Sequence, residues 1–177
     1  MIYHSDIIKS VNKRGVYMKL YIQQKVFSFK DKFKIWNEMG EPKYYAEGEF
    51  FSLGKKLHIY DLAGNEQIFI SQKVFRFWPT YTFSINGSAP AEMKKNFTFF
   101  RQEYVIPEYG ITVTGDFFAH EYEVFRDGKS IATLSKKWLT FGDTYEIDIV
   151  DPADELLALA TILVVDCCMA QAENNNN

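Results

Sequence analysis

The feature that most constrains the fold is an apolar segment near the C-terminus, residues 156–165, in which Thr161 is the one polar side chain. Asp151 and Pro152 precede it, and these residue types are favoured at the N-cap and at the first position of a helix. The segment therefore predicts a helix that is apolar on every side. Such a helix must be surrounded either by protein or by lipid.

The length of this helix favours burial within the protein over insertion into lipid. Ten residues span about 15 Å, whereas the hydrocarbon core of a bilayer is about 30 Å thick, and Asp166 interrupts the apolar run. A strand of ordinary length spans about 17–20 Å. We therefore expect the helix to run through a barrel of strands, with Glu155 and Asp166 at opposite mouths. Insertion of the helix into a membrane is the alternative.

The sequence from residue 20 to residue 150 is typical of β-structure. Short runs rich in Tyr, Phe, Val, Ile and Thr alternate with polar residues, and turn residues separate the runs. We predict strands at residues 20–29, 33–37, 43–51, 56–61, 67–77, 80–86, 96–105, 110–117, 121–126, 129–138 and 144–150. The stretch 88–95 is expected to be irregular.

One hairpin is specified by its turn. Asp127 and Gly128 lie between two predicted strands, and this dipeptide favours a two-residue type I′ turn. A turn of this length pairs Val124 with Ile131 and Tyr122 with Thr133.

A short motif recurs along the chain. Residues 24–29 are repeated at 72–77 and, more weakly, at 136–141. This predicts a strand–bend–strand unit used three times, which suits a closed or nearly closed barrel. The apolar positions of the motif share one parity and are expected to point inward. They are Phe27, Phe75 and Leu139, followed by Phe29, Phe77 and Phe141.

The same repeat carries the candidate ligand-binding residues. Lys25, Lys73 and Lys137 occupy one repeat position with inward parity, so they could ring a barrel mouth and bind an anion or a headgroup. Alternatively, these lysines bury their stems and pair with Asp166 or Glu155. Outward positive charge is expected from a second group of side chains, namely Arg76, Arg101 and Lys136.

Composition narrows the classes of function. The formal net charge is −3, so the chain has no global basic field for nucleic acid. The three histidines, His4, His58 and His120, are far apart in sequence, and no catalytic, phosphate-binding or zinc motif occurs. Cys167 and Cys168 are adjacent, which disfavours a disulfide. We expect two buried thiols, no metal and no cofactor.

The domain boundaries follow from these patterns. We predict one barrel domain over residues 18–170, with its helix at about 152–170. Residues 1–17 form an N-terminal extension, native or not, without the apolar stretch of a secretory signal. Residues 171–177, which end in four asparagines, are expected to be a disordered tail.

Several segments together resemble the LURP-one-related family, called YxjI in bacteria. They are residues 20–25, 125–138, 143–149 and 156–166. The resemblance implies the tubby C-terminal-like superfamily, a mainly β fold in which a closed twelve-stranded barrel is threaded by a C-terminal hydrophobic helix. Phospholipid scramblases are similar in outline. Tubby proteins bind phosphoinositide headgroups through basic side chains, which makes lipid the ligand to test.

We therefore expect a non-enzymatic, cytoplasmic binding or scaffold module that recognises anionic phospholipid, peripherally at a membrane, or a protein partner. Nucleic-acid binding and integral membrane insertion are not expected. One alternative is a membrane-attached, scramblase-like protein that uses its C-terminal helix, and another is an enzyme with an unrecognised site. The candidate ligand-binding residues are Lys25, Lys73, Lys137, Arg76 and Arg101.

Overall fold

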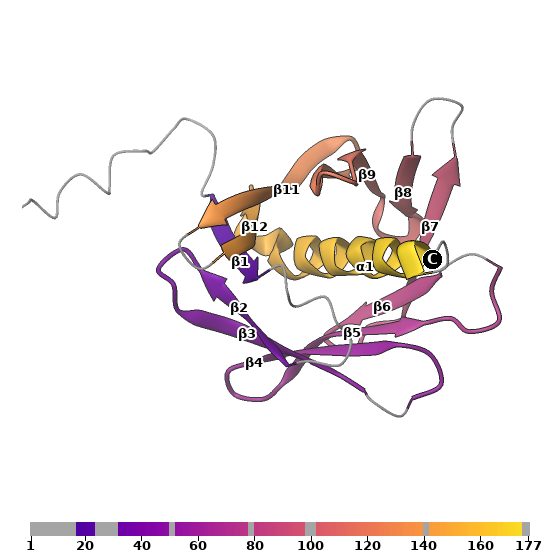
Figure 1. Ribbon diagram of the computed structural model, residues 1–177, viewed down its shortest axis with the longest axis horizontal. Helices are drawn as coiled ribbons and strands as arrows, with labels where there is room; N and C mark the ends of the chain where they lie inside the picture. The colour runs from indigo at the N-terminus through magenta and orange to yellow at the C-terminus, as the bar shows by residue number, and fades with distance from the viewer. Residues whose placement is uncertain are drawn as a thin grey trace, which may run out of the picture.

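Twelve antiparallel strands close into a barrel, as the computed structural model shows (Figure 1). It describes residues 17–23, 32–49, 52–77, 80–97, 102–139 and 142–174. The strands are β1 (Met18–Gln23), β2 (Phe33–Asn37), β3 (Pro42–Gly48), β4 (Lys56–Asp61), β5 (Glu66–Gln72), β6 (Tyr81–Ile85), β7 (Ala91–Phe97), β8 (Gln102–Ile106), β9 (Ile111–Asp116), β10 (Glu121–Arg126), β11 (Lys129–Leu139) and β12 (Gly142–Ile149). Each strand pairs with its neighbour in sequence, and β1 closes the barrel on β12.

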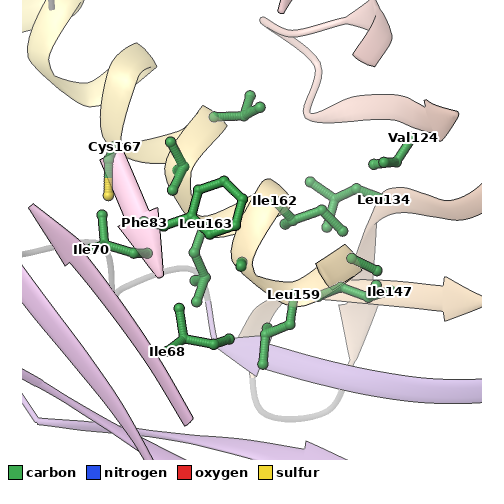
Figure 2. Close-up of a cluster of buried hydrophobic side chains, with 14 of the residues drawn as sticks. Ile68, Ile70, Phe83, Val124, Leu134, Ile147, Leu159, Ile162, Leu163 and Cys167 are labelled. Atoms are coloured by element: carbon green, nitrogen blue, oxygen red, sulfur yellow. The ribbon is translucent and has the colours of Figure 1, made fainter. Parts of the chain in front are cut away.

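The alternation of residue types decides which side chains face the interior. On β5, Ile68 and Ile70 are buried while the residues between and beside them are partly exposed. The same alternation of buried and partly exposed residues occurs on β4 and β10. The inward side chains meet those of the C-terminal helix in one apolar cluster (Figure 2).

The helix begins where its sequence signals place it. The Asp151 side chain accepts a hydrogen bond from the Ala153 amide at 2.9 Å, which caps the short 3-10 helix η3 (Pro152–Asp154). The helix α1 (Glu155–Asn174) follows directly. It ends four residues beyond the predicted boundary, so the first part of the expected tail is helical. Gln171, in this extra turn, accepts a hydrogen bond from the Tyr81 hydroxyl at 3.0 Å.

The apolar surface of α1 is buried by its own chain. All side chains from residue 157 to residue 169 are at most 9% exposed. In Figure 1 α1 runs between β2 to β5 on one side and β9 and β11 on the other. The Tyr122 hydroxyl of β10 also donates to the Ile162 carbonyl at 3.3 Å. The side chains of α1 are therefore packed against strands of the barrel.

The two ends of α1 have different polar contacts. At the N-terminal end, Glu155 accepts a hydrogen bond from the Tyr44 hydroxyl at 2.9 Å and pairs with Lys43 at 2.6 Å. Arg126 pairs with the buried Asp154 at 2.5 Å. Towards the C-terminal end, Asp166 Oδ1 lies 3.6 Å from His120 Nδ1. Asp166 is 3% exposed and the helix continues to Asn174, so the prediction that Asp166 lies at a barrel mouth was wrong.

Two predictions about the strands were wrong. Residues 88–95 contain most of a strand, β7, which pairs with β6 and β8. The β10–β11 hairpin has the expected positive φ at Asp127 and Gly128, 49° and 76°. Its register is shifted by one residue, because a β-bulge follows Val124, which pairs with Ala132, while Tyr122 pairs with Leu134.

The repeat was also misinterpreted. Phe75 and Phe77 were expected to point inward, yet both are 93% exposed. β5 ends at Gln72, and Phe75 lies in a turn with a φ of 61°, so strand alternation does not extend to these positions. The first copy, at residues 24–29, lies outside the described residues.

Thr161 offers a test of core packing. Its side chain is 0% exposed, and its hydroxyl has no hydrogen-bond partner among the described residues. An unsatisfied buried hydroxyl costs about 1–3 kcal/mol, and valine has nearly the same shape. We expect Thr161→Val to stabilise the fold by about 1 kcal/mol, raising the melting temperature by about 2–4 °C. A lower melting temperature would show that the hydroxyl has a partner.

No helix within the described ranges is both long enough and apolar enough to cross a bilayer.

Candidate functional site

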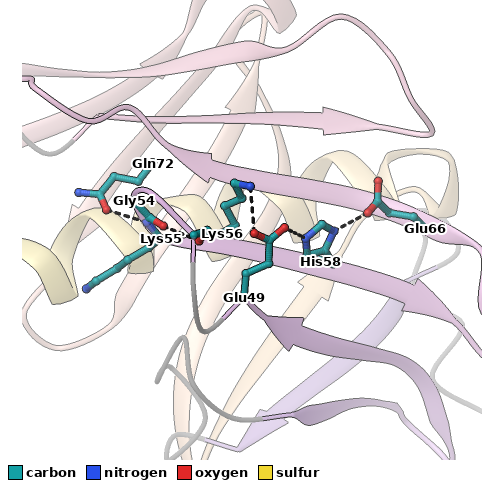
Figure 3. A network of polar contacts seen from close by, with 8 residues as sticks. Glu49, Gly54, Lys55, Lys56, His58, Glu66 and Gln72 are labelled. Carbon is teal, nitrogen blue, oxygen red and sulfur yellow. Dashed lines mark hydrogen bonds and ion pairs between the residues drawn. The ribbon is translucent and has the colours of Figure 1, made fainter.

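The β3–β4 loop is hydrogen-bonded to the end of β5 and closely approaches the β5–β6 loop. The Lys55 amide donates to Gln72 Oε1 at 2.9 Å, and the Gln72 amide donates to the Lys55 carbonyl at 2.8 Å (Figure 3). Gly54 has a φ of +82°, and a Cβ added there would lie 2.8 Å from Val74 Cγ1. Glycine thus permits both the left-handed backbone and the close approach of the two loops.

Three apolar side chains project from these loops into solvent. Phe75 and Phe77 are each 93% exposed, and Leu53 is 76% exposed. A left-handed φ is uncommon for a bulky residue such as Phe75. The phenyl ring of Phe75 is exposed because the backbone of this turn directs it away from the core.

Two cations lie in the same loop, Lys73 and Arg76, and a third, Lys94, lies on the neighbouring strand β7. Lys73 forms an ion pair with Glu92 of β7. The pKa of Glu92 is lowered, first by the hydrogen bond from Lys73 and then by the charges of Lys73, Arg76 and Lys94. Three cations therefore lie near one carboxylate. We call the apolar and cationic side chains together the loop patch, which comprises Leu53, Lys73, Phe75, Arg76, Phe77 and Lys94.

The loop patch lies beside the C-terminal end of α1. The β5–β6 loop leads into Tyr81, the residue that binds Gln171 of the helix. Lys95 follows Lys94 on β7 but lies on the other face of the strand, the face of the buried Ala91 and Met93. Its Nζ is 5.9 Å from the centre of the Tyr104 ring, and burial lowers its pKa.

The predicted site residues are only partly brought together. Lys73 and Arg76 both act on Glu92 and belong to the loop patch. Lys137 is exposed on β11, six strands from β5 in either direction around the barrel, and its Nζ lies 3.7 Å from Glu146 Oε1. Lys25 and Arg101 lie outside the described residues, so the predicted ring of three lysines stays a prediction.

The inward parity predicted for the lysines was wrong for Lys137. Ile131, Ala132 and Leu134 are buried on β11. Beyond Ala132 the alternation places Lys136 on the face of Leu134, and Lys137 is exposed on the outer face. The error arose because the repeat was aligned with the turn of residues 73–77, where strand alternation has already ended.

A model of the LURP-one-related family matches residues 18–166, which include all twelve strands and the apolar part of α1. The chain belongs to the LURP-one-related family. It is 34% identical over 160 residues to "Uncharacterized protein YxjI" of Bacillus subtilis (strain 168), an alignment covering 90% of this chain and 98% of that relative.

An X-ray structure of a protein from Arabidopsis thaliana is similar with a TM-score of 0.63. The similarity covers 86% of this chain and 91% of that one at 13% sequence identity. At this identity it supports the fold of the LURP-one-related protein and nothing further.

A second polar network lies on the outer face of β4. His58 Nε2 is 3.0 Å from Glu49 and Nδ1 is 2.5 Å from Glu66, while Lys56 donates to Glu49 at 2.9 Å (Figure 3). Lys56 and His58 lower the pKa of Glu49 through these hydrogen bonds. Both ring nitrogens are occupied by carboxylates, so the network clamps the β3–β4 loop to neighbouring strands. His58 thus has no nitrogen left for a substrate.

The described residues hold no group of three or more His, Cys, Asp or Glu side chains arranged for a metal ion. Cys167 and Cys168 are free and buried in α1, as predicted.

Sequence reasoning missed four of the six residues of the loop patch in this LURP-one-related protein. Leu53 and Lys94 were not proposed as residues of a site, and Phe75 and Phe77 were assigned to the core. One signal was available, because Trp78 and Pro79 follow directly and proline interrupts strands. Strand alternation is a weaker guide for aromatic residues just before such a break than for aromatic residues inside a strand. The inward face predicted for Phe75 and Phe77 was therefore the least certain part of the repeat.

Proposed function

We propose that this LURP-one-related protein is a non-enzymatic binding module that docks on anionic phospholipid headgroups through the loop patch. The observation that carries the proposal is the turn in which Arg76 stands between two phenylalanines that are each 93% exposed. Positive charge is attracted to anionic lipid surfaces, and each basic residue near such a surface contributes about 1 kcal/mol. Cytoplasmic, peripheral attachment to a membrane is part of the proposal.

A lipid surface fits this patch better than a protein partner does. Protein interfaces bury broad complementary areas around central anchors. The exposed apolar side chains of the loop patch instead come from two loops, with Lys73 and Arg76 near Phe75 in sequence and Lys94 near Glu92, the partner of Lys73. A bilayer accepts projecting side chains without needing a matching shape, and its headgroups supply the complementary charge.

A binding role is also favoured over catalysis by the groups that could react. Burial raises the pKa of the Cys168 thiol to about 12 and that of Cys167 well above its usual value. Thiolate is the nucleophilic form of cysteine, so these thiols are poorly suited to attack a substrate. The nitrogens of His58 are held by Glu49 and Glu66. These contacts support a scaffold whose function lies on its surface.

Vesicle co-sedimentation tests the proposal. The intact chain should sediment with phosphatidylcholine vesicles that contain phosphatidylserine, and less with phosphatidylcholine alone. We expect Arg76→Glu/Lys94→Glu to weaken binding to the anionic vesicles at least about tenfold, because two attractive charges become repulsive. Both side chains are exposed, so the fold should be retained.

The matched control is Lys34→Glu/Lys129→Glu, which changes the net charge equally at exposed positions outside the loop patch. It should bind nearly as well as the unmodified chain. Equal weakening by both pairs would mean that overall charge, and not the loop patch, drives binding. If the unmodified chain does not bind anionic vesicles but captures a protein through the same residues, the lipid assignment is wrong.

A further inference from the structure

We propose that Leu53, Phe75 and Phe77 insert below the headgroups, so that the barrel docks end-on with the C-terminal end of α1 facing the membrane. This inference rests on the proposed function and specifies how the loop patch contacts lipid. Headgroup binding alone would need only the cations, and it would leave the exposure of three large apolar side chains on adjacent loops unexplained.

The loop patch combines exposed apolar rings with cations. Phe75 and Phe77 are each 93% exposed. Lys73 is paired with Glu92 on β7, and its side chain is 38% exposed. Arg76, which lies between the two phenylalanines in sequence, and Lys94 are exposed. In a bilayer, apolar rings are favoured at the acyl boundary while lysine and arginine extend to the headgroup level. The patch therefore supplies the two kinds of side chain that insertion at an anionic surface uses.

The patch is also held in shape before it meets a membrane. The paired hydrogen bonds between Lys55 and Gln72 fix the β3–β4 loop to the last residue of β5, where the β5–β6 loop begins. The Lys73 amide donates to the Thr80 carbonyl at 2.8 Å, which closes the base of the β5–β6 loop. A loop that is already ordered loses little conformational freedom on binding, so more of the insertion energy appears as affinity.

The position of the patch defines the orientation of the whole domain. The patch lies beside the end of α1 that contains Gln171, which binds Tyr81 at the start of β6. Glu155, at the other end, is sixteen residues away, or about 24 Å along the helix axis. That end carries Asp151, Asp154 and Glu155, and Arg126 and Lys43 pair with the last two. Asp151 is thereby kept away from an anionic surface.

The test compares Phe75→Ser/Phe77→Ser with Met39→Ser/Leu62→Ser. The control residues are 73% and 68% exposed and lie in the β2–β3 and β4–β5 turns, outside the loop patch. Binding to phosphatidylserine-containing vesicles should fall at least about tenfold for the phenylalanine pair, because each inserted ring contributes through buried apolar area. The control pair should bind like the unmodified chain. Matching thermal melts would show that both variants fold.

A lipid monolayer distinguishes insertion from surface adsorption. The unmodified chain should raise the surface pressure of a phosphatidylserine-containing monolayer, and Phe75→Ser/Phe77→Ser should not. If the phenylalanine pair binds and raises the pressure normally while Arg76→Glu/Lys94→Glu binds weakly, the insertion inference is wrong and the proposed function stands. If the unmodified chain binds no anionic lipid, both are wrong.

Discussion

Replacing Leu159 by aspartate is expected to prevent stable folding. The Leu159 side chain is 0% exposed and belongs to the same apolar cluster as Ile68 and Ile147 (Figure 2). An aspartate there would be either a buried, unpaired charge or a neutral carboxyl without partners, and both are costly. We expect a loss of more than about 4 kcal/mol, a large part of the about 5–15 kcal/mol that stabilises a typical domain.

Chemical denaturation followed by circular dichroism measures this loss. Leu159→Met is the matched control, because it nearly conserves volume and should cost less than about 1.5 kcal/mol. If Leu159→Asp unfolds at the same denaturant concentration as the unmodified chain, this position is not buried.

The second large effect is expected for Gly115→Ala. Gly115 has a φ of +149°, and a Cβ added there would lie 2.4 Å from the Glu121 carbonyl oxygen and 2.5 Å from Tyr122 Cα. These are backbone atoms of the paired strand β10, so they cannot move aside without disturbing the β9–β10 ladder. We expect a destabilisation of about 3 kcal/mol or more, typical of overpacking combined with backbone strain.

Gly87→Ala separates the two causes. Gly87 has a φ of +70°, but a Cβ there meets no atom within 4 Å. Gly87→Ala should therefore lose only about 1 kcal/mol of folding stability, the cost of a left-handed backbone at alanine. Urea denaturation of both variants gives the difference. Equal losses at the two positions would show that contact with β10 does not restrict Gly115.

The sequence predicted the strands best where the alternation of buried and exposed residues was complete. The bounds of β2, β4 and β10 agree with the prediction. The strand β7 was missed because three of its residues in a row, Lys94, Lys95 and Asn96, are polar. Its position is set by pairing with β6 and β8, which is tertiary information that a local pattern does not contain.

The candidate site was less predictable than the fold. Lys73 and Arg76 lie in a repeated motif, but the ion pair of Lys73 with Glu92 and the effect of the Arg76 charge on that carboxylate depend on the position of the β5–β6 loop next to β7. Phenylalanine is usually a core residue, so the sequence alone assigns Phe75 and Phe77 to the interior. The turn after β5 places both side chains in solvent. Within a strand, the alternation of residue types shows which side chains face the core. A loop has no such periodicity, so the direction of its side chains cannot be inferred from the sequence in this way.

The central claim is that α1 is enclosed by its own chain, which leaves function to the barrel surface. Cys167 and Cys168 report on it directly, because they are the two cysteines of the sequence and both are 4% exposed in α1. In a native-state assay with a thiol-reactive chromogenic disulfide, we expect neither thiol to react until denaturant unfolds the chain. Reaction of both thiols in buffer, at the rate of an exposed cysteine, would contradict the enclosed helix.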